Sequence, residues 1–343
     1  MNDPDPGAIA IVAAGPLLER PWLVADIGGT NARFGWLAAG SDRVEQVDTL
    51  AGAGFDGPAA AAQAYLATLA IRLGAAYQPP RAAAFAVATA VGSDRVTFTN
   101  SGWRFSREAT RRQLALDELL LLNDFEALAL SLPRLKRHQV RGVGPALGTP
   151  AHAALAVIGP GTGLGVAGIM PTPHGWVAVP GEGGHASLSA ADDFESDLLA
   201  TVRRSHPHVS AERLLSGIGL PVLHQAVAAV LRQPSGVLTV EAIVERGLSQ
   251  QDPVCSRTLD SFCALLGSFA GNVALVLGAR GGVYIGGGIV PRLGERFFVS
   301  EFRSRFESKG RFQAYLSAIP TALITDTLVA LTGAAVALEQ HGR

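Results

Sequence analysis

The feature that most constrains the fold is a short apolar segment that ends in a glycine-rich turn, and this combination occurs twice. Residues Trp22–Ala25 run into Asp26–Thr30, and Leu155–Ile158 run into Gly159–Gly165. Short apolar runs bounded by turn residues are typical of buried strands. Because the combination appears once in each half of the chain, we predict two related domains that face each other.

Further strand and helix patterns alternate along the chain, which favours an α/β protein with mixed sheets. Each glycine-rich turn is followed by a return strand, and later apolar runs add more strands. The helices are indicated by Ala- and Leu-rich stretches. We expect strands at Arg33–Leu37, Arg81–Ala90, Leu119–Leu122, Val166–Met170 and Gly282–Ile285, and helices at Pro58–Arg72 and from Asp192 onward.

Length and composition support two cores and make several functions improbable. The 343 residues are 48% hydrophobic and 17% charged, which predicts two globular domains with a ligand-binding cleft. The net charge of −1, without a dense Lys/Arg stripe, disfavours nucleic acid as a partner. Two cysteines, Cys255 and Cys263, are too few for a disulfide framework, so we expect a cytoplasmic protein.

Residues 1–20 are expected to be a loosely ordered extension. The apolar segment Ala8–Gly15 is short and follows Asp3 and Asp5, whereas a secretion signal begins with positive charge. No run reaches the roughly 20 apolar residues that cross a bilayer. We therefore expect no membrane association.

The first turn, Asp26-Ile27-Gly28-Gly29-Thr30, has the residue types of a phosphate site. Glycines let backbone N–H groups approach a phosphate, Thr30 offers a hydroxyl, and Asp26 can hold Mg²⁺ directly or through water. The competing interpretation is a tight hairpin with a capping Asp, which carries about equal weight for this turn alone.

The second turn repeats this arrangement, with Thr162 and Gly163 as the residues suited to phosphate oxygens. Glycine-rich hairpins are common, and neither turn is a Walker A loop or a dinucleotide fingerprint. Two such turns in two similar halves nevertheless favour nucleotide phosphates over packing alone.

Asn123-Asp124 follows four leucines at the end of an apolar strand. That position would hold the Asp124 carboxylate rigidly and raise its basicity toward that of a general base, with Asn123 able to bind a hydroxyl. The alternative is an N-cap for a helix that starts near Phe125, and it carries about equal weight for the dipeptide alone.

Three polar residues in glycine-rich or loop segments suit a polyhydroxy ligand. Glu182 and His185 lie in Pro180–His185, and Glu212 lies in Ser210–Gly217. Carboxylates and imidazoles bind hydroxyls strongly, although a helix start at Ser210 would explain Glu212 equally simply.

A last glycine turn, Gly286-Gly287-Gly288, follows the late strand and precedes Pro291. Its bare backbone offers a flat surface for an adenine ring. A helix-entry turn with Pro291 in the first helical turn explains the same residues, and both interpretations can hold together.

In this order, these segments resemble the bacterial glucokinase family, whose fold is that of actin, Hsp70 and hexokinase. The resemblance runs from about Trp22 to the C-terminus. It rests on six segments: Val24–Arg33, Asn123–Phe125, Gly161–Val166, Pro180–His185, Ala211–Arg213 and Gly286–Arg292.

The resemblance implies ATP-dependent phosphorylation of the 6-hydroxyl of glucose, feeding glycolysis, with ATP and Mg²⁺ as cofactors. It also implies a homodimer and a cytoplasmic location. The implied catalytic base is Asp124, with Asn123, Glu182, His185 and Glu212 on the glucose hydroxyls. The implied nucleotide-binding residues are Ala25, Asp26, Ile27, Gly28, Gly29, Thr30, Thr162, Gly163, Gly287 and Gly288.

The family's fold implies a two-domain actin-like (RNase H-like) ATPase with a cleft between a small domain, 21–135 plus 326–343, and a large domain, 136–325. Two residues depart from the family pattern. Pro160 stands where Ala is common and removes a backbone donor, and Ala90 stands where Pro is expected. The cysteine-rich zinc motif of the related ROK repressors and kinases is absent from the sequence.

Other functions are compatible with the same residues. A kinase for another hexose or amino sugar would use the same fold. A non-catalytic ATP- or sugar-binding regulator would have no use for an Asp base, and a phosphohydrolase of this superfold would release phosphate without any sugar.

Overall fold

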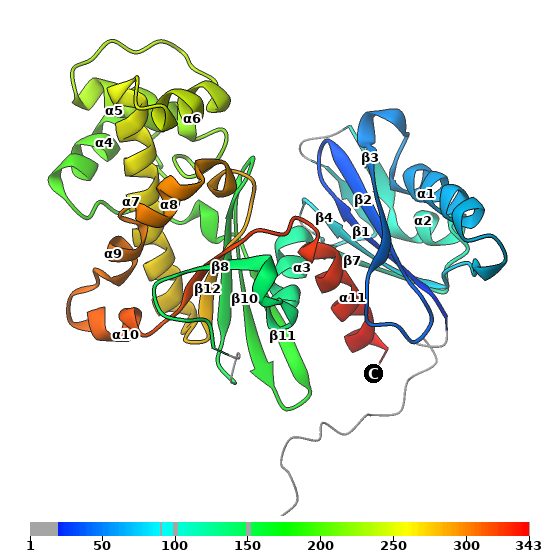
Figure 1. Cartoon of the computed structure of the whole chain (residues 1–343). Coiled ribbons are helices and arrows are strands. Elements are labelled where there is room, and N and C mark those ends of the chain that lie inside the picture. The colour runs from blue at the N-terminus through cyan, green and yellow to red at the C-terminus, as the bar shows by residue number, and fades with distance from the viewer. Residues whose placement is uncertain (1–19, 90, 99–101, 149–151, 343) are drawn as a thin grey trace, which may run out of the picture. The chain divides into compact units, whose positions relative to one another are not determined.

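The computed structural model describes residues 20–89, 91–98, 102–148 and 152–342. These residues form two compact units (Figure 1). Unit 1 contains the described residues up to Ala127 and those from Ala330 onward, and unit 2 contains Leu128–Val329. The chain leaves unit 1 inside a helix, before the predicted boundary at 135, because that helix begins on the sheet of unit 1.

Unit 1 is built on a five-stranded sheet in the order β3-β2-β1-β4-β7. Strand β1 pairs antiparallel with β2 and parallel with β4, and β4 pairs parallel with β7. The register aligns Ile27 with Val87 and Val87 with Asn123, so these three strands end at one edge. The strands are β1 (Trp22–Ile27), β2 (Asn31–Leu37), β3 (Glu45–Ala51), β4 (Ala82–Val87) and β7 (Glu118–Asn123).

Helices cover this sheet, and a separate two-stranded ribbon belongs to the same unit. In α1, Tyr65 is buried and stacks on Phe34 of β2, with ring centroids 5.4 Å apart. The C-terminal helix packs closely on α3, because a Cβ at Gly333 would come 1.6 Å from the carbonyl oxygen of Ala127. The elements are α1 (Pro58–Leu73), α2 (Arg107–Gln113), α3 (Asp124–Ser131), α11 (Val329–His341), and the ribbon β5 (Arg95–Thr97) and β6 (Arg104–Ser106).

Unit 2 is built on a six-stranded mixed sheet in the order β11-β10-β9-β12-β13-β8. Strand β9 pairs parallel with β12, and β12 pairs parallel with β13. The remaining pairs are antiparallel. The strands are β8 (Val140–Val143), β9 (Leu155–Pro160), β10 (Leu164–Thr172), β11 (Gly175–Gly181), β12 (Gly282–Ile285) and β13 (Thr321–Ile324).

The helices of unit 2 pack around α7, the central helix of its core. Close approach requires glycine here, because a Cβ at Gly267 would lie 2.1 Å from the carbonyl oxygen of Phe302. Cys255 and Cys263 are both buried in α7, as free thiols. The helices are α4 (Asp193–Arg203), α5 (Leu220–Val230), α6 (Val240–Leu248), α7 (Pro253–Leu277), α8 (Glu295–Val299), α9 (Phe302–Glu307) and α10 (Gln313–Ser317).

Within the described part of the chain, two segments are long and apolar enough, by length and composition alone, to cross a bilayer: Pro58–Ala76 and Pro253–Leu277. The apolar window of Pro253–Leu277 is 78% buried, as expected of a core helix, whereas that of Pro58–Ala76 is 28% buried. The sequence-based statement that no apolar run is long enough therefore fails by this measure, because scattered small polar residues do not lower the mean hydropathy enough.

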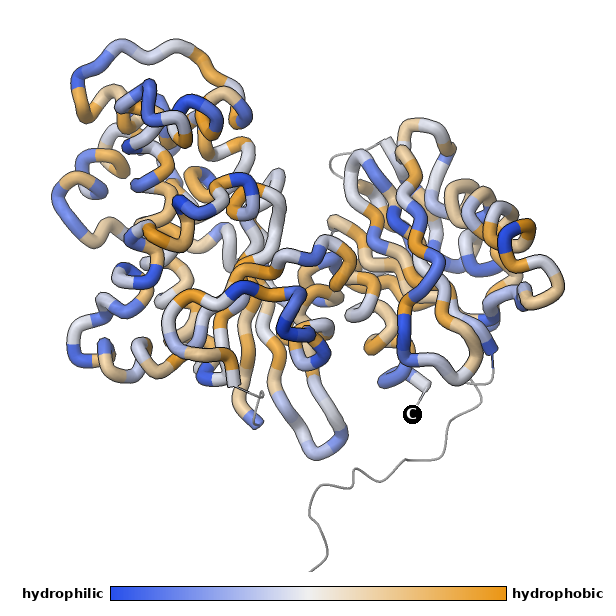
Figure 2. The backbone as a smooth tube through the Cα atoms, in the orientation of Figure 1, coloured by the Kyte–Doolittle hydropathy of each residue, from blue (hydrophilic) through white to orange (hydrophobic). Residues whose placement is uncertain are grey.

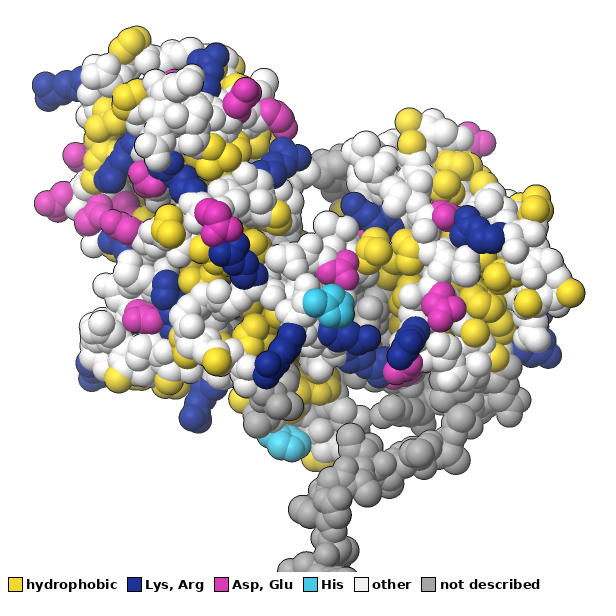
Figure 3. All heavy atoms as spheres, in the orientation of Figure 1, with side chains coloured by type: hydrophobic (Ala, Val, Ile, Leu, Met, Phe, Trp, Pro, Cys, Tyr) yellow, Lys and Arg dark blue, Asp and Glu magenta, His cyan; other side chains and the backbone are white. Residues whose placement is uncertain are grey.

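Hydrophobic residues run through the strands of both sheets (Figure 2), and the central strands β4 and β9 are buried throughout. On the face drawn in Figure 3, acidic and basic side chains are interspersed.

The predicted α/β class with mixed sheets is confirmed by the strand order and pairing of the two sheets. All the predicted strands and helices are present with ends shifted by a few residues, while β3, β5, β6, β8, β11 and β13 were not predicted. Ala90 lies outside the described residues.

Candidate functional site

The β1–β2 turn of unit 1 is held by backbone hydrogen bonds, one within the turn and one from Gly52. The Gly28 N–H donates to the Asn31 carbonyl oxygen at 2.9 Å, and the Thr30 carbonyl accepts from the Gly52 N–H at 2.8 Å. Thr30 is exposed, and Gly28 and Gly29 are half-buried. The Gly28 N–H is therefore occupied within the turn, which leaves Gly29 and Thr30 as the better-suited phosphate donors.

Asp26 lies at the end of β1 beside this turn and forms an ion pair. Its Oδ2 accepts a hydrogen bond from Arg33 Nη1 at 2.9 Å, because the two residues are register partners across β1 and β2. Burial raises the pKa of Asp26, and the charge and hydrogen bond of Arg33 offset this in part. Among the described residues, no cluster of three or more His, Cys, Asp or Glu could hold a metal.

The second feature of unit 1 is the junction between β7 and α3. The strand ends at Asn123 and the helix begins at Asp124, so Asp124 is a helical residue and not the last residue of the strand. The Phe125 N–H is shared between Asn123 Oδ1 and Asp124 Oδ1, both at 2.9 Å. Asn123 Nδ2 donates to the Thr89 carbonyl at 3.3 Å. Asn123 is therefore the N-cap of the helix. The sequence alone allowed either Asn123 or Asp124 to take this position.

Glu126 completes this cap. Burial raises the pKa of Glu126, and a hydrogen bond from the Asn123 backbone offsets this in part. This bond is one half of a capping box, and the Asn123 side chain accepts from the Phe125 N–H in place of the Glu126 N–H. Sequence reasoning missed Glu126, although its place three residues after Asn123 is the signal of such a box.

Sheet register brings the two features of unit 1 together. Ile27, Val87 and Asn123 are neighbours across β1, β4 and β7. The β1–β2 turn and the Asn123-Asp124 junction therefore lie at the same edge of the sheet. This is the edge at which parallel strands of α/β proteins usually present their ligand-binding residues.

In unit 2, the β9–β10 turn is shorter than predicted. Strand β9 continues to Pro160 and β10 starts at Leu164, which leaves Gly161-Thr162-Gly163 as the turn. The Gly161 N–H donates to the Gly163 carbonyl at 2.8 Å, and the Gly161 carbonyl accepts from the Gly217 N–H at 2.7 Å. Pro160 is the last residue of β9 and not part of the turn. The N–H that proline lacks therefore does not reduce the number of backbone donors in the turn.

Glu212 links this turn to the other polar residues of unit 2. Its Oε2 accepts from the Leu164 N–H at 2.9 Å, and its backbone N–H donates to the Gly184 carbonyl at 2.8 Å. His185 Nδ1 lies 4.0 Å from Glu212 Oε1. A Cβ at Gly163 would lie 2.5 Å from Glu212 Oε2. Unit 2 therefore brings the second turn, His185 and Glu212 together.

The segment around Glu212 is not a helix start, contrary to one sequence interpretation. Ser210 Oγ accepts from the Arg213 N–H at 3.2 Å, but the residues that follow form turns, and α5 begins only at Leu220. The turns arise because the Gly217 and Ile218 N–H groups bond to the β9–β10 turn instead of continuing a helix.

Glu182 is exposed and immediately precedes a 3₁₀ turn at Gly183–His185. Its carbonyl oxygen accepts from the His185 N–H at 3.0 Å. The glycines beside it have a packing role that the sequence did not reveal. A Cβ at Gly184 would lie 2.0 Å from the Leu164 carbonyl oxygen, so only glycine lets this loop lie against β10.

The late glycine turn also has a packing role. Gly287 has φ +75°, and a Cβ there would lie 2.3 Å from the Pro160 carbonyl oxygen. Pro291 is in the first turn of a 3₁₀ helix, Val290–Leu293, which confirms the helix-entry interpretation. At Gly288 a Cβ would meet nothing within 4 Å, so there is open space beside this residue.

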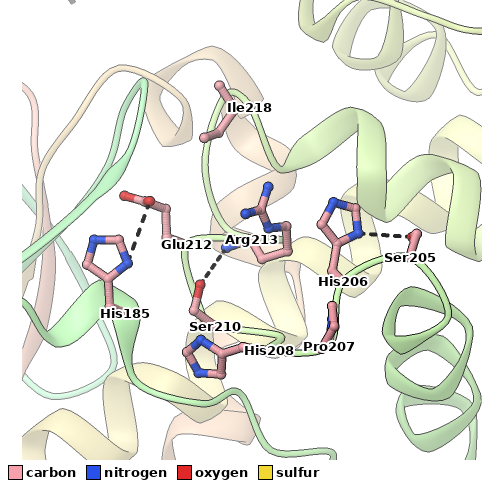
Figure 4. Close-up of a pocket in the computed structure, with 9 residues that line it drawn as sticks. All are labelled: His185, Ser205, His206, Pro207, His208, Ser210, Glu212, Arg213 and Ile218. Carbon is pink, nitrogen blue, oxygen red and sulfur yellow. Dashed lines mark hydrogen bonds and ion pairs between the residues drawn. The ribbon is translucent and has the colours of Figure 1, made fainter. Parts of the chain in front are cut away.

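A pocket of about 320 Å³ lies beside His185 and Glu212 (Figure 4). Within the described residues, Arg213 Nε is buried without a hydrogen-bond partner. Sequence reasoning had not grouped these residues, although the run His206-Pro207-His208 is a visible signal. The lining residues are His185, Ser205, His206, Pro207, His208, Ser210, Glu212, Arg213 and Ile218.

Comparisons with known proteins show the family of this chain. The chain matches the glucokinase family model over residues 23–341. It is 48% identical over 317 residues to a glucokinase of Paramagnetospirillum magneticum, covering 91% of this chain and 96% of that protein. A glucokinase of Neisseria meningitidis serogroup C is 47% identical over 324 residues, covering 94% and 96%.

A solved structure of a glucokinase from an Antarctic psychrotroph is also similar, with 37% identity and a TM-score of 0.84. The match covers 93% of this chain and 98% of that one. Both the sequence and the fold are thus shared along nearly the whole length. The chain belongs to the glucokinase family.

Proposed function

We propose that this protein is a glucokinase that transfers the γ-phosphoryl group of ATP to the 6-hydroxyl of D-glucose, giving glucose 6-phosphate and ADP. The observation that carries the proposal is the contact network in unit 2. The carboxylate of Glu212 lies against Gly163 and Leu164 of a phosphate-type turn and near His185. This places residues suited to sugar hydroxyls directly beside residues suited to phosphate oxygens.

In this proposal, unit 1 supplies the base. Asp124 accepts the proton of the 6-hydroxyl as that oxygen attacks the γ-phosphorus in line, and the bond to the ADP oxygen breaks. The capping bonds of Asn123 and Glu126 hold the first turn of α3 and so fix the backbone that carries Asp124. Asn123 binds a second sugar hydroxyl with its remaining hydrogen-bonding capacity.

Unit 2 binds the rest of the sugar in this proposal, through Glu182, His185 and Glu212. Phosphate oxygens contact Thr162 and Gly163 there, and residues Ala25–Thr30 in unit 1. Gly287 and Gly288 lie against the adenosine. Catalysis of phosphoryl transfer requires mainly that the reactants are positioned and that their charge is neutralised. Backbone turns and fixed carboxylates are sufficient for this.

The residues present fit Mg²⁺ held mainly by the nucleotide. Mg²⁺ is commonly bound by one or two carboxylates together with water and substrate phosphates, and Asp26 provides one carboxylate beside the β1–β2 turn. Bound there, it would neutralise charge on the phosphate oxygens. Arg33 keeps the Asp26 carboxylate oriented at the strand end.

The proposal includes the larger organisation implied by the family. It comprises a two-domain actin-like fold that encloses the substrates and excludes water on closure, with domains at 21–135 plus 326–343 and at 136–325. It also includes a homodimer in the cytoplasm.

A coupled assay of ADP release across a panel of sugars and phosphoryl donors tests the function. We expect glucose and ATP with Mg²⁺ to give the highest kcat/KM, and ³¹P NMR to identify the product as a 6-phosphate. Higher kcat/KM for another hexose or an amino sugar would reassign the substrate. Phosphate release without sugar, or glucose binding without ADP release, would overturn the kinase proposal.

A further inference from the structure

The pocket lined by His185 and Glu212 also has side chains that the proposed reaction does not use, namely Arg213, His206 and His208. Figure 4 shows the Arg213 guanidinium between Glu212 and His206, with His208 below Ser210. All of these residues belong to unit 2, and the volume of about 320 Å³ is enough for a small ligand.

The lining is rich in hydrogen-bond donors. Arg213 carries a permanent charge, and its buried Nε has no partner among the described residues. His206 uses one ring nitrogen with Ser205 Oγ at 3.0 Å, and His208 uses one with Ser187 Oγ at 3.2 Å. Each imidazole therefore keeps a second ring nitrogen for a ligand.

Acceptors are scarce by comparison. Glu212 is the one acidic residue among those that line the pocket. Its Oε2 already accepts from the Leu164 N–H, and its Oε1 faces His185. A ligand that brings its own acceptor oxygens is thus favoured over one that brings mostly donors.

We propose that this pocket binds the phosphate group of a small phosphate monoester, with Arg213, His206 and His208 as the contacting side chains. A planar guanidinium matches phosphate oxygens in pairs, and His206 and His208 each have a second ring nitrogen for another oxygen. One consequence of this phosphate site depends on the proposed function. A hexose phosphate held here would place its sugar against His185 and Glu212 and would exclude glucose.

The pocket is accordingly an inhibitory site for hexose phosphates, distinct from the phosphate turns. The β9–β10 turn contacts the Oε2 side of Glu212 through Gly163 and Leu164. His185, which lines the pocket, faces Oε1. The product of the proposed reaction belongs to the chemical class that would bind.

The test is calorimetry on the full-length protein with inorganic phosphate, glucose 6-phosphate and glucose as separate ligands. The variants are Arg213→Gln and the double variant His206→Gln/His208→Gln. His174→Gln, in the exposed turn between β10 and β11, is the matched control. Thermal melting of each variant reports folding, and the histidine pair carries the test if Arg213→Gln does not fold.

We expect both variants to weaken binding of glucose 6-phosphate and of inorganic phosphate by roughly tenfold or more. Glucose binding should stay within about twofold in the histidine variant. His174→Gln should leave all three affinities unchanged. The Ki of glucose 6-phosphate against glucose should rise by the same factor as its Kd.

Unchanged affinity for both phosphates in the variants would overturn the inference. Equal weakening of glucose and glucose 6-phosphate would also overturn it, because the pocket would then be a neutral sugar subsite. Calorimetry needs no turnover. Failure of the kinase proposal would appear as missing ADP release while phosphate binding and its loss in the variants persisted.

Discussion

The two hairpin turns proposed to hold phosphate look alike in sequence but are built differently. Each turn has an internal backbone hydrogen bond and a carbonyl that accepts an N–H from an outside segment, Gly52 in unit 1 and Gly217 in unit 2. The two turns differ in their side-chain contacts. The β1–β2 turn has the Asp26–Arg33 pair beside it, whereas the β9–β10 turn is followed by Leu164, whose N–H donates to Glu212 Oε2. The second turn is therefore coupled to a side chain that we propose to bind sugar, whereas the first has only a charged pair beside it.

The glycines of the two turns are needed for different reasons. A Cβ at Gly28 would meet only the Asn31 carbonyl oxygen, at an ordinary 3.6 Å, but one at Gly163 would come within 2.5 Å of Glu212 Oε2. Similar glycine-rich turns can thus tolerate a methyl group in one unit and displace a functional carboxylate in the other.

The largest effect should come from Asp124, the proposed base at the edge of the sheet in unit 1. We expect Asp124→Asn to lower kcat by about 10³-fold, within the usual range for a lost general base, while glucose still binds. The ADP assay gives kcat, and calorimetry gives the glucose Kd. Asp117→Asn, an exposed residue next to the other end of β7, is the control. Near wild-type turnover of Asp124→Asn would show that the base lies elsewhere.

A methyl group placed in each turn tests whether the two turns differ in their effect on glucose binding. Gly163→Ala should raise the KM for glucose by roughly tenfold or more, because the methyl moves the Glu212 carboxylate off the Leu164 N–H. Gly28→Ala, its matched control, should change KM by less than about twofold, because its Cβ contact is ordinary. Steady-state kinetics on both variants decides. An equal change in the glucose KM for Gly163→Ala and Gly28→Ala would show that the two turns do not differ in this way.

A smaller effect is expected at Glu182, which is exposed and not tied to either turn. Glu182→Ala should raise the glucose KM by about tenfold with kcat little changed, because a charge-assisted bond to one hydroxyl is lost. Glu245→Ala, an exposed residue on α6, is the control. An unchanged KM for Glu182→Ala would assign the Gly181–His185 loop a structural role.

The sequence predicted the parts of the fold that depend on local pattern. Buried strands such as β4 and β9 are continuous apolar runs, and α1 has its Ala- and Leu-rich face. It did not predict β3, whose sequence EQVDTLA is largely polar, or β8 and β13, which are only four residues long. Such strands form because a neighbouring strand is available for pairing, which a local pattern does not report.

The candidate site was predictable as a set of residues but not as an arrangement. Residue types and spacing identified Asp124, Glu182 and Glu212. The alignment of Asn123 with Ile27 through β4 depends on strand order, and the packing role of Gly184 depends on where the loop meets β10. The pocket at Arg213 brings together segments that have no shared sequence pattern.

The smallest expected effect concerns the stability of the β1–β2 turn in unit 1. Burial raises the pKa of Asp26 in the folded protein, with Arg33 offsetting part of the rise. A group with a raised folded pKa contributes stability that is fully present below its unfolded pKa. That contribution is lost as the pH rises through the folded pKa.

Asp26→Asn should therefore melt at or slightly above the wild-type temperature at pH 7 and lose this advantage toward pH 4. Arg33→Gln should do the opposite at neutral pH, because it leaves the buried Asp26 carboxylate unpaired. About 1 kcal/mol corresponds to a Tm shift of only a few degrees in a protein of this size, so melting curves across pH 4 to 8 must be compared as pairs. If Asp26→Asn were the less stable variant at pH 7 and Arg33→Gln were neutral, the ion pair would outweigh burial. The β1–β2 turn would then depend on a charged contact much as the β9–β10 turn depends on Glu212.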